Sequence, residues 1–243
     1  MYQETADIET ASDDYARRFN GQTGQFFLET QNRICMDLLA DKRTGASILD
    51  VGGGHGQLTK VLLAKGFSVT VTGSDDSCRK RLDANFNQED FVYQTCDSLH
   101  LPFDDNSFDV VISLRLLPHA TQWQGLLSEM CRVANTCVLF DYPDVRSFNF
   151  LYSFLFHIKK RMEGNTRTYT LFRRKQIRDE LTKNNYDTAQ FRAEFFLPMV
   201  YHRKMTNRKF SVFMENIFRY SGITHLFGSP IIVRSNRILQ HDQ

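Results

Sequence analysis

Residues Ile48 to Gly56 read I-L-D-V-G-G-G-H-G, a short apolar run followed by an aspartate and closely spaced glycines. The apolar run predicts a buried strand over Ser47 to Val51, and the leucines and valine of residues 58–63 predict a helix after the glycines. A strand that enters a glycine-rich turn brings its backbone close to a ligand, because a Cβ would obstruct both the positive φ of the turn and the bound molecule. The stretch therefore predicts an α/β fold with a small-molecule site at the tip of this strand.

A second strand and an acidic pair follow. Ser68 to Thr72 is rich in β-branched residues and leads into Gly73-Ser74-Asp75-Asp76, so that Asp75 comes 23 residues after Gly52. A carboxylate at the tip of the neighbouring parallel strand can accept hydrogen bonds from both hydroxyls of a ribose. We expect Asp75 to have this role, or Asp76 if the strand ends one residue later; the alternative for both is a solvated turn.

The glycine spacing separates two kinds of nucleotide site. The NAD fingerprint is G-x-G-x-x-G, whereas here Asp50 precedes glycines in the pattern D-x-G-x-G-x-G. An anion gains nothing from Asp50, but an amino group or a sulfonium does. The pattern resembles motif I of the class I S-adenosylmethionine-dependent methyltransferases. Residues 95–113, T-C-D-S-L-H-L-P-F-D-D-N-S-F-D-V-V-I-S, are similar to the family segment D-x-x-x-L-P-F-x-D-x-S-F-D-V-V.

The resemblance is to the small-molecule branch that includes ubiquinone- and menaquinone-biosynthesis methyltransferases. It implies a Rossmann-like seven-stranded, mostly parallel sheet whose last strand is antiparallel, with helices on both faces and an enlarged helical C-terminal region. It also implies S-adenosylmethionine as cofactor, with S-adenosylhomocysteine as product, and no metal.

The resemblance further implies a set of cofactor contacts. Asp97 would accept from the adenine amino group, unless it is only a helix N-cap, and the backbone at Ser98 would meet the adenine edge. The turn glycines would let the main chain pack against the methionine portion; they are Gly52, Gly53, Gly54 and Gly56. Tyr15 would close over the methionine end from an N-terminal lid, with Arg18 pairing with the carboxylate. The alternative is an ordinary amphipathic helix with Arg18 in solvent.

His119 is the best-placed candidate base. The segment Leu116 to Ala120 leaves the carboxyl end of the predicted fourth strand, Ser107 to Leu114, where a doubly wound sheet binds its second substrate. An imidazole there could take a proton from a phenol during methyl transfer. Alternatively, His119 is a packing residue and direct transfer proceeds by proximity alone.

Length and composition predict one large catalytic domain. The 243 residues are 42% hydrophobic and 24% charged, which suffices for a full core. We expect a helical lid over residues 1–44, a cofactor-binding core over 45–145, acceptor-side helices and strand six over 146–228, and the last strand and tail over 229–243. Five cysteines without a C-x-x-C pair predict reduced thiols and a cytoplasmic location. No apolar run reaches the ~18 residues of a membrane span.

Charge divides the chain into an acidic and a basic part. Residues 1–145 carry 12 Lys+Arg against 21 Asp+Glu, and residues 146–243 carry 18 against 7. The basic part opens with the aromatic stretch 147–161, predicted as a helix that is apolar nearly all round. This helix fits the core or a homodimer interface, a wall of a lipophilic acceptor site that includes Phe150 and Phe154, or a peripheral membrane contact.

The remaining C-terminal elements are predicted to serve the acceptor. We expect strands at Phe191 to Pro198 and Ser229 to Arg237, with a helix from Asn207 to Tyr220 between them. Arg173 and His202 could bind an anionic group of the acceptor, or belong to a solvated basic face.

Three functions remain open at this stage. The first is methylation of oxygen or carbon on a small lipophilic or aromatic acceptor. The second is a nucleic-acid methyltransferase, although Leu114-Arg115-Leu116-Leu117 stands where a base-flipping enzyme carries N-P-P-Y. The third is a non-catalytic protein that binds S-adenosylmethionine or a protein partner.

Overall fold

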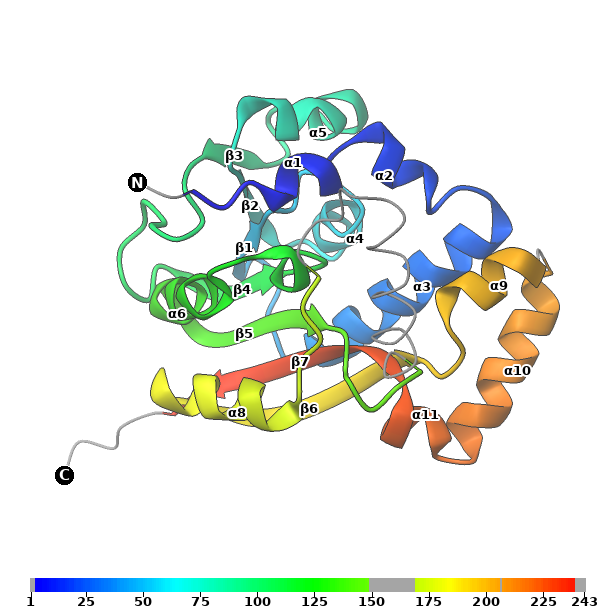
Figure 1. Cartoon of the computed structure of the whole chain (residues 1–243). Coiled ribbons are helices and arrows are strands. Elements are labelled where there is room, and N and C mark those ends of the chain that lie inside the picture. Colours follow the sequence, from blue (N-terminus) through cyan, green and yellow to red (C-terminus); the bar gives the residue numbers. More distant parts are fainter. Residues whose placement is uncertain (1–2, 149–168, 206, 239–243) are drawn as a thin grey trace.

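The computed structural model describes residues 3–148, 169–205 and 207–238 (Figure 1). Its centre is one seven-stranded sheet in the order β3-β2-β1-β4-β5-β7-β6. The strands are β1 (Ser47–Val51), β2 (Ser68–Gly73), β3 (Val92–Thr95), β4 (Phe108–Ser113), β5 (Ala134–Tyr142), β6 (Tyr186–Phe195) and β7 (Ser229–Arg237). Strands β1 to β5 pair in parallel, and β7 lies antiparallel between β5 and β6. The predicted Rossmann-like fold, with its antiparallel last strand beside strand five, is confirmed.

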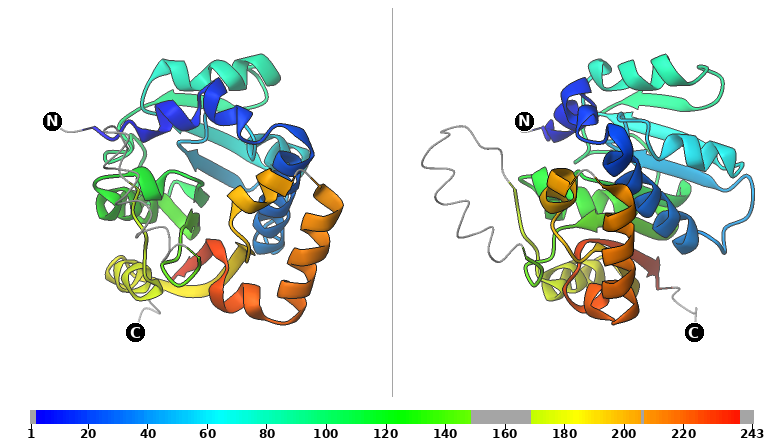
Figure 2. Two further views of the ribbon diagram at one scale, coloured as in Figure 1. Left: turned by 45° about the vertical axis from the view of Figure 1, so that its right-hand side comes forward. Right: turned by 90° about the vertical axis from the view of Figure 1, so that its right-hand side faces the viewer.

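Helices cover both faces of this sheet, so the molecule has three layers (Figure 2). They are α1 (Ala6–Thr10), α2 (Asp13–Arg17), α3 (Gly21–Leu38), α4 (Thr59–Ala64), α5 (Lys80–Asn85), α6 (Trp123–Val133), α8 (Arg174–Lys183), α9 (Met199–Met205), α10 (Arg208–Tyr220) and α11 (Ile223–Phe227), with short 3-10 turns η1 (Asp76–Arg79) and η2 (Leu117–His119). Apolar side chains of α6 and α8 form the core on one face. Those of α3, α4 and α5 form the core on the other.

The parallel register brings the functional loops to one edge. Val51 of β1 lies opposite Thr72 of β2, and Gly73 lies opposite Thr95 of β3. On the other side, Asp50 pairs with Ile112 near the end of β4. The glycine turn, the acidic pair and the loops after β3 and β4 therefore leave the sheet at its carboxyl edge, where open α/β sheets bind ligands.

Two predicted elements have different bounds in the structure. The N-terminal helix divides into α2 and α3 at Gly21, whose φ is +71°, whereas Gly24 lies inside α3. A Cβ at Gly24 would meet the backbone of Phe19, so this glycine permits the tight turn between the two helices. Strand β6 begins at Tyr186 and ends at Phe195, earlier than predicted, and pairs with β7 from Tyr186↔Arg237 to Phe195↔Ser229. At its start the Tyr186 hydroxyl donates to the carbonyls of Cys131 and Ala134 at 3.1 and 2.9 Å.

Helices α9, α10 and α11 lie together beside α3 and β6, at one end of the molecule (Figure 1). The predicted helix 147–161, with Phe150 and Phe154, lies outside the described residues except for Ser147 and Phe148. Within the described part of the chain, no helix has both the length and the apolar character needed to cross a membrane.

Candidate functional site

The glycine turn packs tightly against the protein around it. Gly52 has φ +72°, and a Cβ there would lie 2.8 Å from Cδ2 of Leu116. At Gly53 a Cβ would meet the Asp50 carboxylate, and at Gly54 it would meet the Cys78 carbonyl. Gly56 also has a positive φ, of 68°. The turn therefore favours glycine at Gly52 and Gly56 through their positive φ, and at Gly53 and Gly54 through the close approach of neighbouring protein atoms.

Asp50 is a carboxylate in the interior of the protein, directly before the glycine turn. Its side chain has no exposed surface, and neither oxygen has a partner among the described residues. Burial raises the pKa of Asp50 to about 7, and the charge of Arg115 opposes this rise. Because an unpaired buried carboxylate is costly, the position suits a ligand that brings a donor or a positive charge.

The two predicted nucleoside carboxylates lie at the tips of β2 and β3. Asp75 is exposed and accepts from the Ser77 N–H at 2.8 Å, which caps η1. Hydrogen bonds from the Ser77 side chain and then from its N–H lower the pKa of the Asp75 carboxyl. Asp97 accepts from the Leu99 N–H at 3.0 Å and contacts Nδ1 of His100 at 2.9 Å. The neighbouring Ser98 is buried. Asp76 is exposed and accepts from the Thr95 hydroxyl, which ties the tips of β2 and β3 together.

A segment that the sequence analysis did not single out lies over the glycine turn. Asp7 of α1 is 4% exposed and accepts from the backbone N–H and the hydroxyl of Ser74, at 2.6 and 2.5 Å. Glu4 accepts from the Gln122 N–H at 2.6 Å, beyond β4. A Cβ on Gly52 would lie 3.4 Å from the Asp7 Cβ. Residues 4–11 thus run from the tip of β2 to the loop after β4, across the predicted cofactor crevice (Figure 1).

Tyr15 belongs to α2, which follows this segment in the chain and lies in the region predicted to form a lid. The Ser12 hydroxyl accepts from its N–H at 3.2 Å and caps α2. Its ring contacts Phe19 with centroids 5.7 Å apart, and the Arg18 guanidinium lies 4.8 Å from the ring centroid. Burial raises the pKa of the Tyr15 phenol. Arg18 is largely exposed and reaches Glu9 at 3.5 Å.

His119 ends η2, directly beyond β4, at the predicted edge of the sheet. Its ring lies 5.6 Å from that of Tyr169, between centroids, and is partly buried. The structure therefore places this imidazole near the carboxyl edge, in contact with the segment that precedes α8.

The two described acceptor candidates lie apart from each other. Arg173 is exposed and borders a groove with Val145, Arg146, Arg174 and Lys175. His202 has no exposed surface: its Nε2 lies 2.9 Å from Oε1 of Glu215, and phenylalanine rings enclose it. Glu215 also accepts from the N–H groups of Phe196 and Leu197, both at 2.9 Å. In this structure His202 is a core residue and offers no surface to an acceptor, contrary to its predicted role.

Arg115 lies against the predicted lid and is not among the predicted site residues. It lies two residues after the end of β4 and is 8% exposed. Its Cζ is 4.7 Å from the centroid of the Phe19 ring and 5.9 Å from that of the Tyr15 ring. The one signal in the sequence was a single cation inside the apolar run Leu114 to Leu117.

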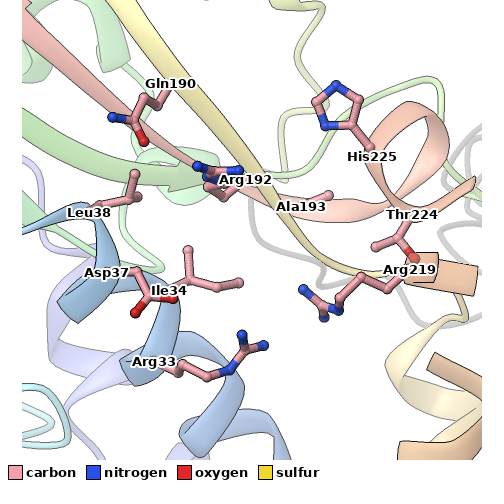
Figure 3. Close-up of a pocket in the computed structure, with 10 residues that line it drawn as sticks. All are labelled: Arg33, Ile34, Asp37, Leu38, Gln190, Arg192, Ala193, Arg219, Thr224 and His225. Carbon is pink, nitrogen blue, oxygen red and sulfur yellow. The ribbon is translucent and has the colours of Figure 1, made fainter. Parts of the chain in front are cut away.

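A separate cavity of about 330 Å³ lies on the α3 side of the sheet (Figure 3). It is lined by Arg33, Asp37, Arg192, Arg219 and His225 among others, and shares no residue with the predicted cofactor site. The Arg33 and Arg219 side chains reach towards the space between their helices, and the charge of Arg33 contributes to a lowered pKa of Arg219.

The strand order and the loops at the carboxyl edge define the class I, Rossmann-like methyltransferase fold. Residues 49–136 match the family described as "Methyltransferase domain". This match spans the glycine turn and the strands from β1 to β4, and it agrees with the class I S-adenosylmethionine-dependent type that the motifs resemble.

Individual proteins show how far the likeness extends. The "Ubiquinone/menaquinone biosynthesis C-methyltransferase UbiE" of Roseobacter denitrificans is 36% identical over 104 residues, 40% of this chain and 41% of that protein. The "Probable tRNA methyltransferase 9B" of Mus musculus is 30% identical over 117 residues, 46% of this chain and 25% of that protein. The chain thus spans less than half the length of either of these curated relatives.

Among solved structures, the magnesium protoporphyrin IX methyltransferase of Synechocystis PCC 6803, with bound SAH, superposes with a TM-score of 0.64. The sequence identity is 17%, and the match covers 93% of this chain and 94% of that chain. At this identity, the likeness establishes the fold alone.

Proposed function

We propose that the chain is an S-adenosylmethionine-dependent methyltransferase that acts on a small lipophilic or aromatic acceptor, at oxygen or carbon. The observation that carries the proposal is the convergence of the glycine turn, Asp75 and Asp97 on one edge of the sheet, within the stretch that matches a methyltransferase domain. Solved neighbours bind the sulfur nucleosides at this fold: the Synechocystis enzyme is described once with SAH and once with SAM.

The residues at the crevice fit this cofactor. The buried oxygens of Asp50, which have no partner among the described residues, suit the ammonium group of its methionine portion. Asp75 is exposed at the tip of β2, where a ribose would approach, and Asp97 and Ser98 flank the expected place of the adenine. Residues 4–11 occupy part of the same crevice, so binding requires this segment to adjust.

When bound, the cofactor supplies a methyl group made electrophilic by its sulfonium. The contribution of the chain is to hold the acceptor in line with that methyl group and to exclude water. His119 lies near the carboxyl edge and is the candidate to receive a proton from the acceptor. Because burial raises the pKa of Tyr15, its phenol stays protonated at neutral pH and suits hydrogen bonding more than proton abstraction.

The first test is calorimetric titration with S-adenosylhomocysteine. We expect wild-type protein to bind and Asp75→Ala to bind at least about tenfold more weakly, because each lost hydrogen bond to a charged group is worth about 1.5–3 kcal/mol. Asp83→Ala, an exposed carboxylate on the next helix, is the matched control and should bind as wild type does. Absence of binding to the wild type would refute the proposed function.

Methyl transfer separates the remaining alternatives. Protein with tritiated S-adenosylmethionine is offered prenylated phenols in one assay and bulk tRNA in another. Label in the phenols supports the proposal, and label in tRNA alone supports the nucleic-acid alternative that the mouse relative suggests. Binding of the cofactor without transfer to either acceptor would favour the non-catalytic alternative.

A peripheral membrane location, on the cytoplasmic side, is a further part of the proposal, and helix α10 supports it. The residues that α10 buries are polar, Ser211 and Glu215, whereas its outer face exposes an apolar stripe: Phe210, Phe213, Ile217 and Tyr220. Residues 199–227, which contain α9 to α11, carry five Lys+Arg, and their one acidic residue is the buried Glu215. Arg208 of α10 pairs with Glu29 of α3, and the other cations of this segment flank the aromatic stripe, which suits an anionic lipid surface.

Co-sedimentation with vesicles tests this surface. Wild-type protein should bind vesicles that contain phosphatidylserine, and bind them less in high salt, whereas Phe213→Ser should lose most of the bound fraction. Val92→Ser replaces an exposed apolar residue elsewhere and is the control. A concentration-dependent dimer that Phe213→Ser abolishes, without vesicle binding, would instead identify α10 as the interface of a homodimer.

A further inference from the structure

Arg115 has a backbone conformation that few arginines adopt. Its φ is +63°, in the left-handed region, which costs a residue with a Cβ on the order of 1 kcal/mol. The Arg115 N–H donates to Oδ1 of Asp141 at 2.5 Å, at the buried end of β5. This bond holds the strained backbone in place and thereby fixes the direction of the side chain.

The guanidinium group of Arg115 is buried. Nε, Nη1 and Nη2 are all enclosed and have no hydrogen-bond acceptor among the described residues. The Phe19 and Tyr15 rings cover the group, at 4.7 and 5.9 Å from Cζ. A guanidinium presents five donors in a planar fork that matches a carboxylate, and leaving it unpaired in the interior is costly.

Two buried carboxyl groups, Asp50 and Glu194, lie near enough for the charge of Arg115 to act on them. Both oxygens of Asp50 and Oε1 of Glu194 have no partner within the described ranges. Burial raises the pKa of both carboxyl groups, and the charge of Arg115 opposes this rise. None of the described ion pairs joins Arg115 to Asp50 or to Glu194. The site therefore presents a guanidinium and carboxyl groups that no described ion pair joins.

Building on the proposed function, we propose that Arg115 binds the carboxylate of an α-amino acid group whose ammonium is directed towards Asp50. A zwitterion satisfies both charges at once, whereas a dianionic phosphate would face the neighbouring Asp50, Asp141 and Glu194. Two molecules could supply this group: the methionine portion of the cofactor, or an acceptor that is an amino acid.

Calorimetry with a truncated ligand tests the first source. S-adenosylhomocysteine carries the amino acid group and 5′-methylthioadenosine does not. If the cofactor supplies the carboxylate, Arg115→Gln should bind S-adenosylhomocysteine at least about tenfold more weakly and 5′-methylthioadenosine as wild type does. Arg192→Gln, at the cavity of Figure 3, is the control. The proposal would be overturned if Arg18→Gln lost affinity for S-adenosylhomocysteine alone while Arg115→Gln bound both ligands as the wild type does.

The second source is tested with L-tyrosine and tyramine, which differ by the carboxylate. If an acceptor supplies the carboxylate, protein saturated with S-adenosylhomocysteine should prefer L-tyrosine, and Arg115→Gln should lose that preference while keeping its nucleoside affinity. No effect of Arg115→Gln on either ligand pair overturns the proposal and leaves the proposed function standing. If wild-type protein does not bind S-adenosylhomocysteine, the proposed function is refuted instead. The affinities of nucleoside-free wild type and Arg115→Gln for L-tyrosine and tyramine then decide the role of Arg115.

Stability provides a readout that separates ligand binding from a structural role. Arg115→Gly relieves the positive φ and removes the unpaired charge, so its thermal midpoint should equal or exceed that of the wild type while the carboxylate-dependent affinity falls. A lower midpoint with unchanged affinity would show that Arg115 serves the fold alone, and would overturn the proposal.

Discussion

Three buried carboxyl groups set the pH dependence of stability. Burial raises the pKa of Asp50 to about 7, of Asp141 to about 6 and of Glu194 to about 8. In the unfolded chain these groups titrate near pH 4, so between pH 4 and 8 the folded state binds more protons than the unfolded state. Stability should therefore fall as pH rises through this window.

Asp50→Asn isolates one part of this effect. The amide cannot ionise, so the variant should lose less stability than the wild type between pH 5 and 8, by on the order of 3 kcal/mol. Urea unfolding at a series of pH values measures the difference. Parallel pH profiles for the two proteins would show that Asp50 does not titrate in this range.

His202 shows how burial decides the role of a residue. Its ring bonds to Glu215 inside a cluster of phenylalanines, so His202→Ala should lower the unfolding free energy by about 1–3 kcal/mol. S-adenosylhomocysteine affinity should stay unchanged. His225→Ala, at an exposed histidine, is the control and should unfold as the wild type does. A large loss of acceptor affinity with unchanged stability would restore the predicted acceptor role of His202.

At the scale of elements, α1 is held by one carboxylate. Asp7 accepts two hydrogen bonds from Ser74, and their loss should cost about 1–3 kcal/mol. In Asp7→Ala the amides of residues 6–10 should exchange with deuterium faster, whereas those of β1 should not. Asp13→Ala, which removes an exposed ion pair with Arg81, should change little. Unchanged exchange of α1 in Asp7→Ala would mean that other contacts hold the helix.

Element type was predictable where the cause is local. The β-branched run of β2 and the apolar stripe of α6 each follow from their own period, and Asn207 caps α10 through the Phe210 N–H at 3.1 Å. Strand β6 was placed too late because it begins where it pairs with β7, at Tyr186↔Arg237. No local pattern contains that pairing.

At the scale of the whole molecule, the two oppositely charged parts of the chain share one sheet. Strand β7 pairs with β5 from Cys137↔Asn236 to Tyr142↔Ile231. Arg234 of β7 also donates to the Leu38 carbonyl at 2.6 Å and to Asp41, in the N-terminal part. The basic C-terminal part is thus joined to the acidic part through backbone and side chains alike.

This connection predicts a single cooperative unfolding transition. Scanning calorimetry should give a calorimetric enthalpy equal to the van't Hoff enthalpy. Arg234→Gln should lower the midpoint of the whole transition, because it breaks contacts between both parts. Two separated transitions would instead show that the residues after 145 form an independent unit.

The sequence by itself predicted an α/β fold, the strands on either side of the glycine turn and a small-molecule site at their tips. Strand periodicity, the glycine turn and the spacing of acidic residues are local properties, and parallel strands place their tips at one edge whatever covers them. The tertiary structure alone decided three features: the docking of Asp7 on Ser74, the unpaired burial of Arg115 and the enclosure of His202. Each depends on contacts between distant segments, such as Glu4 with Gln122, 118 residues apart, and a local pattern does not carry such contacts.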